Sequence, residues 1–140
     1  MTVLERIHAW GHENIICTHK TTIEITKDVD VTKKGDCILG VNASKACYDL
    51  SQDLKRQIQR GSKFKILLKV ENIHDFFYGY GNKDLKLLDR KDMVFRKSNF
   101  ICNRTVLINC SKSSKELNRE LTDLLKQPGK KIIIIFELNE

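Results

Sequence analysis

The chain has 140 residues, of which 41% are hydrophobic and 31% are charged, and its formal net charge is +7 at pH 7. This composition is typical of one soluble domain, which at this length buries roughly 68–70% of its unfolded surface. The longest apolar run, residues 132–136, is far shorter than the ~20 residues of a membrane span, and Glu5, Arg6 and His8 interrupt any signal peptide. We therefore expect a cytoplasmic protein without a membrane partner, folded as a single domain over residues 1–140.

The first half of the chain predicts strands and one helix. Residues 4–10 and 15–26 are rich in apolar and β-branched side chains and predict strands, the second of them bent or bulged. Ser44 is a suitable N-cap for a helix that extends to about Arg60 and buries one stripe of side chains. The stripe consists of Ala46, Leu50, Leu54 and Ile58. A strand at residues 37–41 is expected to precede this helix, and an apolar strand at residues 64–70 is expected to follow it.

The second half of the chain presents the same order of elements. Residues 76–80 and 105–110 predict strands, and the capping box at 113–116 predicts the start of a second helix. Its apolar stripe consists of Leu117, Leu121, Leu124 and Leu125. Pro128 and the glycine after it end this helix, and residues 132–138 predict a final strand.

The two halves form an internal repeat. Residues 41–58 and 108–125 align without a gap, which predicts two units, about 3–72 and 73–140, related by a pseudo-twofold axis. Strands on either side of each helix favour a parallel, right-handed crossover. We therefore expect an α+β fold of duplicated, strand-rich β-β-α-β-type units, with a mixed curved sheet or a partly closed barrel and two helices packed outside.

One short motif supports the barrel alternative. Gly35 and Asp36 follow a valine-containing segment and resemble the Gly-Asp turn of the cradle-loop β-barrels, which are also built from duplicated halves. In the second half, Cys102 and Asn103 fall at the equivalent place. The turn itself is expected to be architectural, because glycine permits a positive φ and aspartate accepts backbone N–H groups.

The densest polar cluster of the strand predicted over 15–26 is Thr18–Thr22. His19 is the candidate acid/base group, since imidazole titrates at about pH 6.5, and the neighbouring ammonium and hydroxyl groups could bind a phosphate. Arg96–Asn99 forms a related cluster in the second half, and the two would converge if their strands meet at the twofold axis. The candidate ligand-binding residues are Lys20, Thr21, Thr22, Arg96, Lys97, Ser98 and Arg104. The structural alternative is a solvated strand face with a hydrogen-bonded histidine.

Two further features are compatible with an anionic ligand. Residues 76–81 interleave aromatic residues with glycine, and bases could stack on such a strand, although core packing and a tight turn explain the pattern equally well. Residues 83–104 contain seven lysine or arginine residues and three aspartates. A basic excess attracts phosphates, nucleic acids or acidic metabolites, and the alternative is a lysine-rich surface that serves solubility.

The cysteines and histidines do not predict a metal site. The five cysteines are scattered without a Cys-x-x-Cys pair, which is typical of free thiols in a reducing compartment and predicts neither a disulfide nor a zinc site. His8 and His12 could share a metal, but the sequence places no third ligand beside them. No phosphate-loop, dinucleotide-binding or metalloprotease motif occurs. We therefore expect no cofactor and no metal.

Five motifs in a fixed order carry a resemblance that covers nearly the whole chain. They are Trp10–Ile15, Thr18–Thr22, Gly35–Ile38, Val94–Ser98 and Arg104–Thr105. Together they resemble the archaeal domain-of-unknown-function family 371. The resemblance implies a small cytoplasmic archaeal protein and supplies no activity, substrate or catalytic residue.

Two functions remain open on this basis. The first is a binding protein for a phosphate-bearing ligand, either RNA or a nucleotide, through the basic and hydroxyl cluster. The alternative is a small enzyme that acts on a phosphorylated or anionic metabolite, with His19 as acid/base group and Lys20 and Arg96 holding the anion.

Overall fold

The computed structural model describes residues 2–140. The first half of the chain forms β1 (Thr2–Trp10), β2 (Thr22–Thr26), β3 (Ile38–Gly40), the 3₁₀ turn η1 (Cys47–Asp49), α1 (Gln52–Gln59) and β4 (Lys63–Val70). The second half forms β5 (Ile73–Tyr80), β6 (Asp92–Arg96), β7 (Thr105–Leu107), the 3₁₀ turn η2 (Ser114–Glu116), α2 (Arg119–Leu124) and β8 (Lys131–Leu138). The order of elements in the first half therefore recurs in the second. The fold is α+β and strand-rich, as expected.

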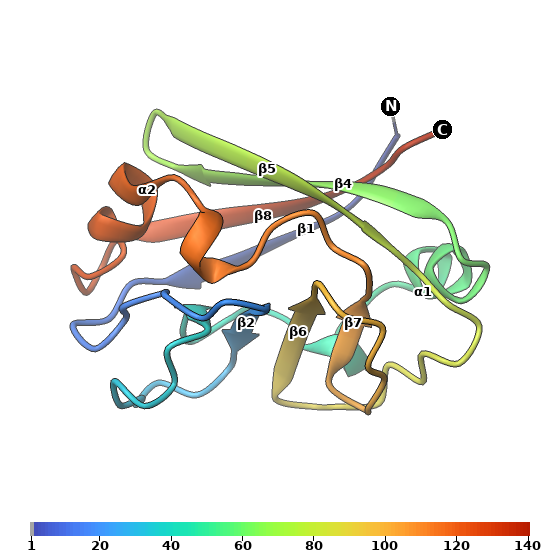
Figure 1. Cartoon of the computed structure of the whole chain (residues 1–140), viewed down its shortest axis with the longest axis horizontal. Coiled ribbons are helices and arrows are strands. Elements are labelled where there is room, and N and C mark those ends of the chain that lie inside the picture. Colours follow the sequence, from blue (N-terminus) through green and yellow to red (C-terminus); the bar gives the residue numbers. More distant parts are fainter. Residues whose placement is uncertain (1) are drawn as a thin grey trace.

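The strands form two four-stranded sheets that lie face to face (Figure 1). Sheet A has the order β1-β8-β4-β5 and is antiparallel throughout. Sheet B has the order β3-β2-β6-β7, with an antiparallel pair in the centre and a parallel pair at each edge. The helices α1 and α2 lie at opposite ends of the layered structure (Figure 1). In the described chain, no helix is both long and apolar enough to cross a bilayer.

Aromatic side chains join the two sheets in one core. Phe95 of sheet B contacts Phe77 and Phe136 of sheet A, with ring centroids 5.3 and 5.8 Å apart. Phe64 continues the cluster at 6.4 Å from Phe136. All four rings are fully buried, together with the leucine and isoleucine stripes of both helices. Each sheet therefore uses its inner face for the core, as the alternating burial of β4 and β8 shows.

Two expectations about the topology are wrong. The sheets do not close into a barrel, since β1 and β5 are the edges of sheet A and β3 and β7 are those of sheet B. Nor does either helix make a crossover within one sheet, because the strand before each helix lies in sheet B and the strand after it lies in sheet A. Each helix is a connection between the two layers, which places it at the end of the core and not over an outer face.

The long strand and long helix expected in the first half are both shorter. Only Thr22–Thr26 of the strand predicted over 15–26 is extended in a sheet. The preceding segment is a loop, because the Asp36 carbonyl accepts the N–H groups of Thr18 and His19 at 2.8 and 3.2 Å. The helix begins eight residues after Ser44 and is capped by Ser51, whose side chain accepts the Leu54 N–H.

The expected N-cap of the first helix and the capping box of the second have different roles. Ser44 bonds the edge of sheet A, where its Oγ accepts the His8 N–H at 3.1 Å. The capping box at Ser113–Glu116 forms, but it caps the turn η2. The helix α2 follows after its own cap, Asn118, which accepts the N–H groups of Glu120 and Leu121. In both halves, side-chain oxygens that precede the helix thus accept backbone N–H groups of a strand edge or a 3₁₀ turn, and they do not extend the helix toward the N-terminus.

Candidate functional site

The structure brings together the two polar clusters that the sequence analysis selected. Thr22 of β2 lies opposite Arg96 of β6 in the centre of sheet B. Beyond the strand pair, the Lys97 N–H donates to the Thr21 carbonyl at 2.9 Å. We call this region the β2–β6 cluster. It comprises His19, Lys20, Thr21, Thr22, Arg96, Lys97, Ser98 and Arg104.

His19 organises the loop that leads into β2. Its Nδ1 accepts the N–H groups of Thr21 and Thr22 at 3.1 and 3.2 Å. A ring nitrogen that accepts two N–H groups carries no proton, so the proton of the neutral ring lies on Nε2. Asp89 accepts the N–H groups two and three residues ahead of it in the same way, at 3.1 and 2.7 Å. In the second half, Asp89 therefore has the hydrogen-bonding role that His19 has in the first half. The sequence analysis instead matched the segment of His19 with Arg96–Asn99, and the hydrogen bonds do not support that match.

The cations of the β2–β6 cluster are largely bound by other groups of the protein. The Arg96 Nε donates to the Thr105 hydroxyl at 2.8 Å, and its guanidinium lies 4.9 Å from the centre of the Phe100 ring. Lys97 forms an ion pair with Glu116 at 2.7 Å. Lys20, Thr21 and Ser98 have exposed side chains. These internal contacts leave Lys20 as the cation of the cluster that is most available to a ligand.

Arg104 bridges two buried carboxylates that the sequence analysis did not select. Its guanidinium lies 3.3 Å from Glu24 and 3.2 Å from Asp92, on the two central strands of sheet B. Burial, followed by the charge of Asp92, raises the pKa of Glu24. Among the described residues, Oδ1 of Asp92 is buried without a hydrogen-bond partner. Two acids therefore share one guanidinium, and an excess of negative charge remains when both are ionised.

Two half-buried thiols lie near these carboxylates and differ in acidity. Burial raises the pKa of Cys37 to about 11, and its Sγ lies 3.9 Å from Glu24. Burial also opposes ionisation of Cys102. There, the Arg104 N–H, the Thr105 hydroxyl and the Arg96 guanidinium outweigh it and lower the pKa to about 7.

The outer face of sheet A is a second candidate site, and the sequence analysis missed most of it. Strand registers align its outward side chains in rows across the four strands. They are Arg6, His8 and Trp10 of β1, Lys131, Ile133, Ile135 and Glu137 of β8, Lys63, Lys65, Leu67 and Lys69 of β4, and His74, Phe76, Tyr78 and Tyr80 of β5. Because both helices pack against the core side, neither covers this face (Figure 1).

The charge of this face is positive and not neutralised internally. Five of its side chains are cationic, and one, Glu137, is a carboxylate. Within residues 2–140, none of the five cations forms an ion pair. Several instead lie over aromatic rings, with Lys63 at 4.7 Å from the Tyr78 centroid and Lys65 at 4.5 Å from that of Phe76. Such ammonium groups remain available to phosphate oxygens.

Two hollows border the β8 side of this face. One, of about 430 Å³, is lined by Lys69, Lys130 and Lys131 together with Ile133 and Glu71. The other, of about 180 Å³, lies on the far side of Lys131 and is lined by Arg6, Ile7 and His8. Both are lined mainly by basic residues and open to solvent, so they add concave anchoring points to this face.

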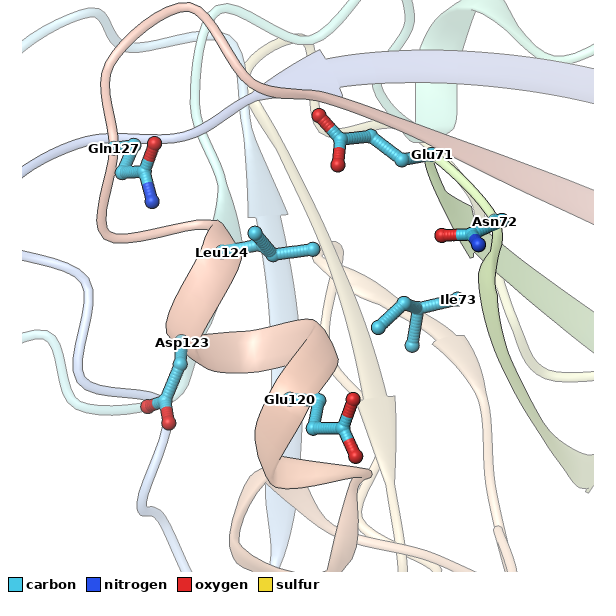
Figure 2. Close-up of a pocket in the computed structure, with 7 residues that line it drawn as sticks. All are labelled: Glu71, Asn72, Ile73, Glu120, Asp123, Leu124 and Gln127. Carbon is cyan, nitrogen blue, oxygen red and sulfur yellow. The ribbon is translucent and has the colours of Figure 1, made fainter.

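A third hollow, of about 400 Å³, has the opposite charge. It lies between α2 and the turn that joins β4 to β5 (Figure 2). Leu124 and Ile73 point toward each other across it, and the carboxylates of Glu71 and Glu120 border it, while Asp123 points away (Figure 2). An anionic ligand would meet like charges here, so this hollow is not a phosphate site.

The family model described as a domain of unknown function (DUF371) matches residues 7–139. The chain belongs to this family. The uncharacterized protein MJ0206 of Methanocaldococcus jannaschii is 46% identical over 127 residues, which are 91% of this chain and 93% of that protein. The resemblance found in the five sequence motifs is thus confirmed. The matched region of this DUF371 protein includes the β2–β6 cluster and nearly all of the outer face of sheet A.

One sequence signal of the DUF371 chain could have located this face. In residues 63–70, lysines recur at alternate positions between buried apolar residues. The sequence analysis predicts an apolar strand here, whereas the period of two indicates a strand with one apolar and one basic face. The same register places Phe76 beside Leu67 and Tyr78 beside Lys65. Which of these residues are neighbours depends on the pairing of the strands, and the alternation within one strand does not predict that pairing.

Proposed function

We propose that this DUF371 protein binds a phosphate-bearing ligand, RNA in preference to a free nucleotide, on the outer face of sheet A. The observation that carries the proposal is a sheet face on which five cations, none of them in an ion pair within residues 2–140, lie beside partly exposed aromatic rings. Nucleic-acid affinity arises mainly from phosphate neutralisation by lysine and arginine. A face that extends across four strands matches a polymer better than it matches one small metabolite, which needs an enclosing pocket.

The contrast with sheet B also supports the choice of face. In the β2–β6 cluster, Arg96 and Arg104 are held by groups of the protein, and Lys97 pairs with Glu116. Binding a phosphate there would require these contacts to break. On sheet A, the ligand would replace solvent and cation–π contacts, and no ion pair of the five cations described there would have to break. Lys20, Thr21 and Ser98 remain a smaller candidate site for a single phosphate group.

We further infer that the two halves are related by a pseudo-twofold axis between β2 and β6. Matched contacts support this inference: Trp10 pairs with Val41 as Tyr80 pairs with Ile108. Likewise, the His19 carbonyl accepts an N–H from η2, as the Asp89 carbonyl accepts one from η1. Such an axis would make β1 and β5 equivalent edges of sheet A. Both edges carry basic or aromatic residues on the outer face, so a ligand could be held from either side.

The enzymatic alternative has less support. His19 uses Nδ1 for the two backbone N–H groups, so only its Nε2–H remains to act on a ligand. An imidazole in this tautomer donates a hydrogen bond and does not accept a proton at Nδ1 without breaking the loop. If the protein acts on an anionic metabolite, His19→Gln should abolish turnover, whereas RNA binding by sheet A should be unaffected by this change.

The proposal is tested by fluorescence anisotropy with a labelled single-stranded RNA. The variant Lys63→Ala/Lys65→Ala removes two cations from the face, and Lys33→Ala/Lys34→Ala removes two exposed cations from the loop between β2 and β3. We expect the first variant to bind roughly tenfold or more weakly and to lower the salt slope by about 1 to 1.5, given about 0.7 per neutralised phosphate of a single strand. The loop variant should bind like the wild type.

Two results would contradict the proposal. Equal losses in both double variants would indicate general attraction to the net charge and no defined face. Wild-type protein that fails to bind RNA at low salt would exclude the function itself. A nucleoside triphosphate used as competitor distinguishes the two ligand sizes, since it should displace the RNA only at far higher concentration.

A further inference from the structure

We infer that bases of single-stranded RNA stack on the aromatic side chains of the edge strand β5, namely Phe76, Tyr78 and Tyr80. This inference rests on the proposed function and specifies which form of RNA the face recognises. The three rings occupy alternate positions of one strand, so they share the outer face of sheet A. Base–aromatic stacking requires a free base face, which a single strand offers and a duplex does not.

The exposure of these rings is not explained by packing. Phe76 and Tyr80 are 42% and 39% exposed and Tyr78 between them is half-buried, whereas Phe77 on the opposite side of the strand is 1% exposed and fills the core. A strand that buries Phe77 on one side needs no aromatic residue on the other side for its own stability. Exposed aromatic groups in one row at a sheet edge are typical of surfaces that bind a partner. The row is adjacent to the lysines of β4, which supports an anionic partner that also has apolar faces.

The spacing of the rings suits unstacked bases. Alternate residues of a strand are about 6.6–6.8 Å apart, roughly twice the 3.4 Å rise per nucleotide of a stacked strand. Two bases on neighbouring rings therefore cannot stack directly on each other. Phe76 and Tyr78 are also nearly perpendicular, with an interplanar angle of 79° and centroids 5.7 Å apart, so each presents its surface in a different direction. The strand thus holds bases separately, as it would for an extended RNA.

Lysine side chains lie directly beside these rings. Lys63 is 4.7 Å from the Tyr78 centroid and 5.8 Å from that of Tyr80. Lys65 is 4.5 Å from the Phe76 centroid. Lys112 approaches the same ring at 5.5 Å but is held in an ion pair with Asp75 at 2.7 Å, so Lys63 and Lys65 are the cations available to the ligand. Lysine ammonium groups are mobile and can leave a ring face for a phosphate oxygen. A base on the ring and a phosphate on the neighbouring lysine would use both groups at once.

The test compares ligands with and without bases. Anisotropy titrations use a labelled ten-nucleotide oligoadenylate, an abasic strand of the same length, the corresponding RNA duplex and, as competitor, inorganic polyphosphate. The variant Phe76→Leu/Tyr78→Leu/Tyr80→Leu should lose about fivefold or more in oligoadenylate affinity for each ring that holds a base. Its affinity for polyphosphate and for the abasic strand should change less than twofold.

Matched variants separate stacking from charge and from folding. Tyr78→Phe/Tyr80→Phe keeps the rings and should bind like the wild type. Tyr48→Leu removes another exposed ring, which also has two cations beside it but lies in η1, away from this face. It should have no effect. If the triple variant loses its circular dichroism spectrum, the single change Tyr80→Ala provides the same comparison at a 39% exposed position.

Each outcome is decisive. Oligoadenylate and the abasic strand binding equally well to the wild type, or duplex binding as tightly as the single strand, would overturn the stacking inference and leave the proposed function intact. The same holds if the triple variant retains full affinity for oligoadenylate. Failure of every polyanion to bind would instead contradict the proposed function.

Discussion

Removal of the Arg104 guanidinium tests the buried acid pair of sheet B most directly. The side chain lies 3.3 Å from Glu24 and 3.2 Å from Asp92, whose own side chains are only 11% and 7% exposed. Loss of one partner of a buried ion pair costs about 3–5 kcal/mol, because a charge remains uncompensated. The Arg104 side chain is 44% exposed, so solvent screens part of this interaction. We therefore expect Arg104→Ala to lower the free energy of unfolding by about 2 kcal/mol.

The matched variant is Glu24→Gln, which removes one of the two acids and keeps the shape of the side chain. Repulsion from Asp92 then disappears, so this change alone should be neutral or slightly stabilising at pH 8. In the double variant Glu24→Gln/Arg104→Ala, a single buried carboxylate remains. The double variant should therefore lose less stability than Arg104→Ala does. The double-mutant cycle gives the coupling free energy between Glu24 and Arg104.

The pH dependence follows from the raised pKa of Glu24. The folded state then binds a proton more tightly than the unfolded state does. The resulting penalty is absent below the unfolded pKa of glutamate and increases as the pH rises toward the folded pKa. Wild-type stability should therefore decrease across this interval relative to that of Glu24→Gln. Arg104→Ala should extend the decrease to higher pH, since an acid without its cation ionises later.

The assay is urea unfolding, followed by circular dichroism from pH 4 to pH 8 and evaluated by linear extrapolation. An Arg104→Ala protein as stable as the wild type would refute the reasoning. So would a Glu24→Gln protein destabilised as much as Arg104→Ala, because the two acids would then not compete for one guanidinium.

Two further predictions concern a thiol and a glycine. Because the pKa of Cys102 is lowered to about 7, iodoacetamide at pH 7.5 should modify this thiol first. Burial raises the pKa of Cys17, Cys47 and Cys110 to about 11 or 12, so peptide mapping should find these three unmodified in the folded protein. Equal rates of modification would contradict this prediction. A Cβ built on Gly81 would overlap the Ile58 carbonyl, so Gly81→Ala should lower the free energy of unfolding in urea by about 3 kcal/mol or more. The control Gly61→Ala has open space around its Cβ but a φ of +85°, and should lower it by only about 1–2 kcal/mol. Similar losses in the two variants would show that the close contact at Gly81 is not rigid.

The sequence by itself determined the order of the helices and strands and much of the local secondary structure. The apolar stripes of both helices, the strands at 64–70 and 132–138, and the recurrence of the same order in both halves were predictable, because helix and strand periodicity depends on neighbouring residues. Family membership was also readable, from five short motifs. The density of polar groups at Thr18–Thr22 identified a real meeting point with Arg96, although the local counterpart of His19 proved to be Asp89.

Only the tertiary structure decided which strands pair and which surfaces remain open. β1 lies beside β8, at the other end of the chain, and the β4 and β5 registers join lysines to aromatic residues. Alternation along residues 63–70 shows that Lys63, Lys65 and Lys69 share a face, but not whether a helix covers it. Helices that connect sheet B to sheet A fill the ends of the core and leave that face uncovered. Likewise, Glu24 and Asp92 share one guanidinium because β2 and β6 pair across 65 intervening residues, a contact that depends on long-range packing and has no local signal.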